Sequence, residues 1–156
     1  MTVYHQRRRV RYTPEQIFDL VADAASYPEF IPWCTKAVVR NREVLGDDRE
    51  RVEADLHVKF KVYEEWFRTR ATLDRAGRRI HIKYIEGPFH HLTNRWRFEE
   101  NRDGSCTIDF WIDFKFRSKA LQLLVGAVFG EAVRRMVAAF EARADELYGG
   151  RPRRTG

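Results

Sequence analysis

The sequence predicts an α+β fold in which a seven-stranded, curved antiparallel sheet is covered by one long C-terminal helix, with an apolar cavity between them. Residues 36–117 alternate apolar and polar side chains, which is typical of strands with one wet face. After residue 118 the apolar side chains recur at a helical period instead. A large sheet twists, and a single helix about 10 Å wide leaves room beneath it. We therefore expect a cavity on the inner face of the sheet.

The N-terminal part is expected to form an edge strand followed by a pair of short helices. Residues 3–12 alternate loosely and carry four arginines, which favours an edge position or a wet outer face. The segment Thr13-Pro14-Glu15-Gln16 can supply an N-cap, a first helical residue and a capping box, so a helix is predicted to about residue 24. Residues 26–34 hold two prolines and several aromatic side chains. They indicate an aromatic turn that plugs the core or lines a cavity mouth.

Six more strands are predicted before the last helix. The clearest alternation runs through residues 52–60 and 108–116, and weaker versions run through 36–45, 62–73, 78–85 and 91–100. The final helix is expected to continue to about residue 148 and to be roughly 45 Å long. Its first third is apolar nearly all round and contains Gly126 and Gly130, which suggests close packing or a movable lid.

Length and composition favour a single domain over residues 1–149, followed by a disordered basic tail over 150–156. The two cysteines lie far apart, and no apolar run approaches the roughly 20 residues that cross a bilayer. An intracellular setting is therefore expected. The net charge of +6 favours anionic partners, either a membrane surface or a ribosome, and DNA is not expected. Arg7, Arg9 and Arg11 share one side of the first strand and are the candidate basic patch.

Catalytic and metal chemistry are poorly supported by the residue pattern. The acidic residues Glu53, Asp55, Asp109 and Asp113 alternate with core residues and are expected to face solvent. His90 and His91 are adjacent on a strand, so they point to opposite faces and cannot share one metal ion. We therefore expect no metal, no required cofactor and no enzyme activity. A cyclase that uses Tyr84 or a histidine of the cavity as acid or base remains an open alternative.

Several segments resemble the ubiquinone-binding branch of the START-like, polyketide-cyclase superfamily. These are residues 12–23, residues 27–34, and Gly87-Pro88-Phe89 with Leu92, Asn94, Trp96 and Phe98. The resemblance implies a helix-grip fold that holds coenzyme Q or a similar isoprenoid lipid, without catalysis, in support of respiration. It also implies a bacterial cytoplasmic protein, at most peripheral on the inner membrane. The same family includes bacterial toxins that block association of ribosomal subunits, and the motifs do not separate the two activities.

The predicted ligand site is an apolar tunnel, because such pockets are mostly apolar with few polar groups. The apolar helix segment 120–130, flanked by Arg117 and Lys119, is the candidate contact with an anionic membrane surface. The wall is predicted to comprise Phe30, Trp33, Val58, Phe60, Tyr84, Phe89, Phe110, Phe114, Leu121, Leu124, Val125 and Val128.

Overall fold

The computed structural model describes residues 2–60 and 62–149, so the predicted basic tail lies outside the described residues. The predicted fold class is confirmed, with the short helices after the first strand and the long helix at the end. In chain order the elements are β1 (Thr2–Val10), α1 (Pro14–Ala22), the 3₁₀ helix η1 (Ala24–Glu29), β2 (Cys34–Gly46), β3 (Arg49–Phe60), β4 (Tyr63–Asp74), β5 (Arg79–Glu86), β6 (Phe89–Glu100), β7 (Cys106–Phe116) and α2 (Lys119–Tyr148).

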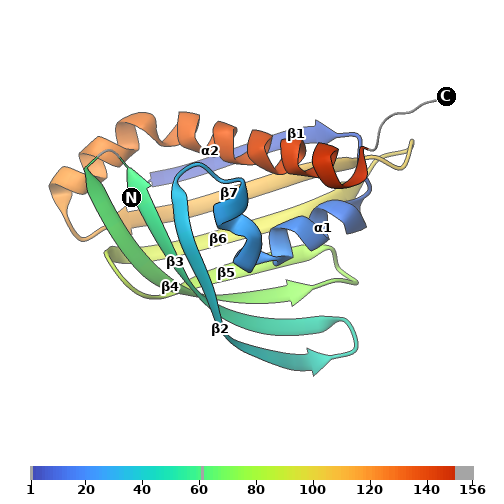
Figure 1. Ribbon diagram of the computed structural model, residues 1–156, viewed down its shortest axis with the longest axis horizontal. Helices are drawn as coiled ribbons and strands as arrows, with labels where there is room; N and C mark the ends of the chain where they lie inside the picture. The colour runs from blue at the N-terminus through green and yellow to red at the C-terminus, as the bar shows by residue number, and fades with distance from the viewer. Residues whose placement is uncertain (1, 61, 150–156) are drawn as a thin grey trace.

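The strands form one antiparallel sheet in the order β1-β7-β6-β5-β4-β3-β2, which makes β1 and β2 the edges. The edge position predicted for the first strand is thus confirmed. Three register shifts interrupt the pairing of β2 with β3, and such bulges bend a strand. Figure 1 shows α2 lying across the sheet beside β1 and β7, while β2 and β3 curve away on the side of α1. The sheet therefore encloses a space beneath α2.

The capping box predicted at the start of α1 is present in the structure. The Thr13 hydroxyl accepts a hydrogen bond from the Gln16 backbone N–H, and the Gln16 side chain accepts one from the Thr13 backbone N–H. The helix that follows ends at Ala22 rather than at 24, because the chain turns at Asp23 into η1. The predicted aromatic turn is partly this 3₁₀ helix, which accommodates Pro28.

The turn between β5 and β6 requires its glycine. Gly87 has a φ of +143°, which side-chain-bearing residues rarely adopt. A Cβ atom there would also lie 2.6 Å from Cβ of Phe67. Only Gly87 and Pro88 separate the two strands, so Phe89 enters β6 immediately and its ring packs against Phe67.

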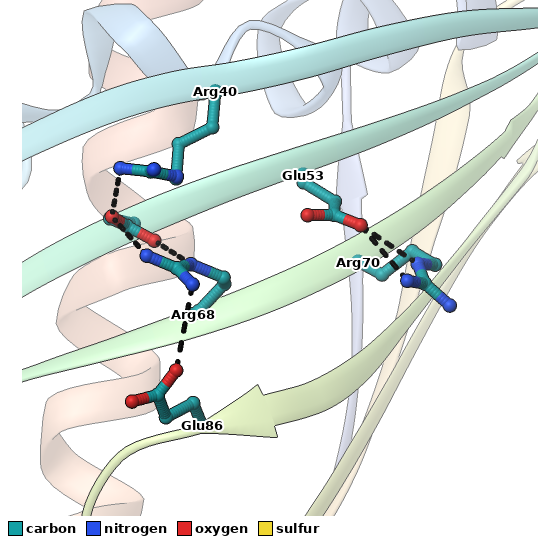
Figure 2. A network of polar contacts seen from close by, with 6 residues as sticks. Arg40, Glu53, Arg68, Arg70 and Glu86 are labelled. Atoms are coloured by element: carbon teal, nitrogen blue, oxygen red, sulfur yellow. Dashed lines mark hydrogen bonds and ion pairs between the residues drawn. The ribbon is translucent and has the colours of Figure 1, made fainter.

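The outer face of β2–β5 carries an ion-pair network (Figure 2). Arg68 donates from Nε to Asp55 Oδ1 over 2.7 Å, and Arg40 Nη1 lies 3.3 Å from Asp55 Oδ2. Asp55 faces outward as predicted, but only 8% of it is exposed, because these arginines cover it. The hydrogen bond from Arg68 lowers the pKa of the Asp55 carboxyl.

Candidate functional site

An apolar cavity of about 260 Å³ lies between the inner face of the sheet and α2. The strands expose alternate residues to it, so β3 contributes Val52, Ala54, Leu56 and Val58. The helix contributes residues at a spacing of three to four, which places them on one face of α2. These are Val125, Val128, Phe129, Ala132, Val133, Met136 and Phe140.

An aromatic cluster forms part of the cavity wall. Trp96 is 3% exposed, and its ring contacts Phe110 and Phe140 edge-on, with centroid distances of 4.7 and 5.5 Å. The Trp96 Nε1–H donates to Asn94 Oδ1 over 2.9 Å. This cluster joins β6 and β7 to the C-terminal half of α2.

Asn94 and Thr69 are buried polar side chains in the mostly apolar wall. Asn94 is 7% exposed and donates from Nδ2 to the Trp111 carbonyl over 2.9 Å, which fixes its amide. Thr69 is 5% exposed, and its hydroxyl has no hydrogen-bond partner among the residues described. Thr69 is on β4 and Asn94 on β6, so one strand separates them. The cavity thus offers a free hydroxyl and a positioned amide to a bound molecule with an oxygen atom.

The ionisable groups of the wall are unsuited to proton transfer near neutral pH. Burial raises the pKa of the Cys34 thiol to about 11 and also raises the pKa of the Tyr27 phenol. The Tyr27 hydroxyl donates to the Val21 carbonyl. Within the described part of the chain, no aspartate, glutamate or histidine lines the cavity.

The cavity reaches the surface beside Trp33 and Lys59. Lys59 is the exposed member of the described lining, and its backbone N–H donates to the Trp33 carbonyl over 2.9 Å. The Trp33 Nε1–H is buried and has no acceptor in the described residues.

Seven of the predicted wall residues line the cavity: Trp33, Val58, Phe89, Phe110, Phe114, Val125 and Val128. Four do not. The Phe30 ring packs outside it against Phe140 and beneath the Arg143 guanidinium. The Tyr84 ring packs on Phe89, and its hydroxyl accepts the Phe89 N–H.

The other two are Leu121 and Leu124, in the first turns of α2, and neither reaches the lining. Leu121 is buried and Leu124 half-buried at that end of the helix. The side chain of Phe60 lies outside the described part of the structure. The residue pattern missed Thr69, Asn94, Met136 and Phe140 as wall residues. Their alternation and helical spacing were visible, but burial alone does not tell a core position from a cavity position.

The described residues offer neither a metal site nor a membrane-spanning helix. Residues 2–60 and 62–149 contain no group of three His, Cys, Asp or Glu side chains placed to hold a metal ion. His91 Nε2 instead lies 3.2 Å from Asp113 Oδ1. None of the described helices is both long and apolar enough to cross a bilayer.

Comparison with known proteins connects this geometry to a family. Residues 10–141 match the family described as polyketide cyclase / dehydrase and lipid transport. The ribosome association toxin RatA of Escherichia coli K12 is 34% identical over 142 residues, which cover 91% of this chain and 86% of that protein. The mitochondrial coenzyme Q-binding protein COQ10 homolog B of Xenopus laevis is 31% identical over 150 residues, 94% of this chain and 59% of that protein.

A solved structure is also similar to this chain over nearly its whole length. The solution structure of the 18 kDa protein CC1736 from Caulobacter crescentus superposes with a TM-score of 0.81 at 35% identity, covering 96% of this chain and all of that one. The similarity therefore extends over the sheet, the cavity and α2 together.

Proposed function

Because the chain belongs to the polyketide cyclase, dehydrase and lipid transport family, we propose that its cavity binds an isoprenoid lipid, with ubiquinone as the expected ligand. The observation that carries the proposal is an enclosed apolar cavity with a free Thr69 hydroxyl and a fixed Asn94 amide. Such a wall suits a neutral ring with carbonyl oxygens and an apolar tail. The coenzyme Q-binding relative supports this ligand class.

The size of the cavity limits how the ligand is held. A volume of about 260 Å³ is slightly below the roughly 300–1,000 Å³ of typical small-molecule sites. It accommodates the quinone ring and the start of the tail. We propose that the remaining tail leaves through the mouth beside Trp33 and Lys59, which suits a carrier that delivers quinone to or from a membrane.

A non-catalytic role agrees with the chemistry of the wall. A cyclase needs an acid or base close to the reacting carbon. Tyr84, the candidate acid or base from the sequence, lies outside the lining and is held by the Phe89 N–H. With the pKa values of Cys34 and Tyr27 raised, binding without turnover is the proposed activity.

Filling the cavity tests the lipid proposal. Ala71 lines the cavity on β4, and Ala71→Leu is expected to remove copurified quinone while the fold remains intact, because the added carbons occupy ligand space. The measurement is mass spectrometry of organic extracts from gently purified protein. Thr72→Leu is the matched control, since Thr72 is the next residue and faces the other side of the sheet.

Two outcomes contradict this proposal. One is an Ala71→Leu protein that carries quinone at the wild-type ratio. The other is a wild-type extract without quinone, from protein that also fails to bind added quinone in a fluorescence titration.

We also propose that the mouth contacts an anionic membrane. Val62, after β3, is 90% exposed, and Leu123, in the first turns of α2, is 77% exposed. Each lies within a few residues of a lining side chain, Val58 or Val125. Arg117 precedes α2 and Lys119 is its first residue, so both add positive charge at the start of the helix. Apolar side chains beside cations are the usual means of interfacial binding.

The membrane contact predicts that Leu123→Asp weakens binding to phosphatidylserine vesicles about tenfold, since burial of a leucine contributes roughly 1.5–3 kcal/mol. Vesicle cosedimentation is the measurement. Leu147→Asp, 53% exposed near the other end of α2, is the control and is expected to bind normally. Equal losses in both variants argue against a localised contact.

A second proposed function is binding to a ribosomal subunit, which the RatA relatives support. The observation in its favour is positive charge on the outer face of the sheet, where Lys83, Arg95 and Arg97 are exposed. The face is opposite the cavity, so it does not compete with lipid binding.

A further inference from the structure

The arginines of the first strand do not form a free basic patch. Arg7 lies 2.8 Å from Glu99 and 2.6 Å from Asp109. Arg9 lies 2.8 Å from Asp103, and Arg11 lies 3.2 Å from Asp145. The sequence-based choice of this strand as the site for an anionic partner is therefore not supported, because each of these cations has a carboxylate partner.

Three cations outside the ion pairs of the described residues lie together on β5 and β6. Lys83, Arg95 and Arg97 are exposed and have no carboxylate within 4.0 Å among the residues described. With half-buried His81 they form the outer-face cation cluster. Figure 2 shows the contrast on β3 and β4, where Arg68 and Arg70 each face a carboxylate.

Strand pairing places two of these side chains opposite cations. Arg97 is opposite Arg79 on β5, and its partner on β7 is Asp109. Lys83 is opposite Arg70. Like charges directly opposite each other destabilise a sheet. Burial lowers the pKa of His81, which is opposite Arg95, and the charges of Lys83 and Arg95 lower it further.

Arg95 has a second feature that suits a nucleic acid. Its guanidinium carbon lies 4.1 Å from the centroid of the Trp111 ring, on the neighbouring strand β7. The guanidinium thus lies over the ring, while Arg95 itself remains exposed. A flat, exposed guanidinium is a surface on which an unpaired base can stack.

We propose that the outer-face cation cluster is a binding site for single-stranded or loop RNA, with the cations contacting phosphates and Arg95 stacking on a base. The choice of RNA rests on the second proposed function. A bilayer fits this face less well, because the most exposed apolar side chains, Val62 and Leu123, are near the cavity mouth. Unpaired bases also match the stacking surface better than a duplex does.

The test compares two triple variants that each remove three positive charges. The cluster variant is Lys83→Gln/Arg95→Gln/Arg97→Gln. The control is Lys36→Gln/Arg49→Gln/Arg102→Gln, whose side chains are also outside the ion pairs of the described chain. Binding of a fluorescein-labelled single-stranded RNA is measured by anisotropy over a range of salt concentrations.

The cluster variant is expected to lose at least tenfold in affinity. Its plot of log K against log salt should be shallower by about 2, since each phosphate of a single strand contributes about 0.7. The control should change less than about threefold, which reflects net charge alone. Arg95→Lys keeps the charge but loses the flat stacking surface, so its affinity should fall with the salt slope unchanged.

A stability measurement provides an independent readout. Removing cations that face cations should leave the melting temperature of the cluster variant equal to or above that of the wild type. Loss of RNA binding with a raised or equal melting temperature supports a binding role. A lowered melting temperature with unchanged RNA binding overturns it.

Cosedimentation with ribosomal subunits separates this inference from the second proposed function. If the cluster variant still binds ribosomal subunits, the second proposed function holds but the outer-face cation cluster is not the contact surface. If the wild type binds RNA but no ribosomal subunit, the cluster binds RNA and the second proposed function is wrong. Equal losses in both triple variants, or a loss confined to phosphatidylserine vesicles, overturn the RNA site.

Discussion

Trp96→Ala is expected to destabilise the fold by about 3–5 kcal/mol, the usual cost of removing a large buried aromatic side chain. Trp96 is 3% exposed and contacts rings from β6, β7 and α2, so its loss opens a hole where the sheet meets the helix. The measurement is urea unfolding followed by far-ultraviolet circular dichroism.

Two further variants make this result specific. Trp96→Phe keeps a ring but removes the donor to Asn94, so a smaller loss of about 1–2 kcal/mol is expected. Trp66→Ala is the control, because Trp66 is 38% exposed on the outer face. A Trp96→Ala protein no less stable than Trp66→Ala would show that the aromatic cluster does not hold α2 to the sheet.

Arg68→Ala is expected to lower the free energy of unfolding at pH 7 more than Arg70→Ala does, since it leaves the covered Asp55 carboxylate with Arg40 alone. Asp55→Asn should cost less, because it removes the covered charge itself and leaves no carboxylate that lacks a partner. Chemical denaturation of both variants measures the difference. Arg70→Ala, which removes an exposed pair with Glu53, is the control and should cost under about 1 kcal/mol.

The same network predicts a pH dependence. Arg68 lowers the pKa of Asp55 in the folded state below its unfolded value of about 3.9. The stability that Asp55 contributes is therefore fully present above pH 3.9 and is lost as the pH falls through the folded pKa. The stability advantage of the wild type over Asp55→Asn should shrink in that acidic window. An advantage that is constant from pH 7 to pH 2 contradicts the assignment.

Local patterns were sufficient to predict the fold. The alternation in residues 52–60 and 108–116, the capping box at Thr13 and the change of period after Ser118 are each set by neighbouring residues. Their order leaves one arrangement in which α2 covers the sheet. The end of α1 at Ala22 was not predictable, because it depends on how the chain turns at Asp23.

The candidate site was only partly predictable. Whether an inward residue lines a cavity or fills the core depends on tertiary packing. Leu121 was predicted to line the cavity and does not, whereas Phe140 was not predicted to line it and does. Ion pairing is also a tertiary property. Neighbouring residues do not reveal that Arg7 pairs with Asp109, 102 positions away, while Arg97, although opposite Asp109 in the register, has no carboxylate within 4.0 Å among the described residues. The basic face could therefore be located only from the strand register.

The two cysteines lie in different environments: Cys34 is in the cavity wall, and Cys106 is in the packed core. Cys34 lines the cavity near its mouth, and Cys106 begins β7 with no exposed surface. Burial raises their thiol pKa values to about 11 and about 12, so both are protonated and protected at neutral pH. A thiol reagent can reach Cys34 when the mouth opens locally, whereas Cys106 requires disruption of the core. The ratio of the alkylation rates of Cys34 and Cys106 thus distinguishes local opening of the cavity mouth from global unfolding.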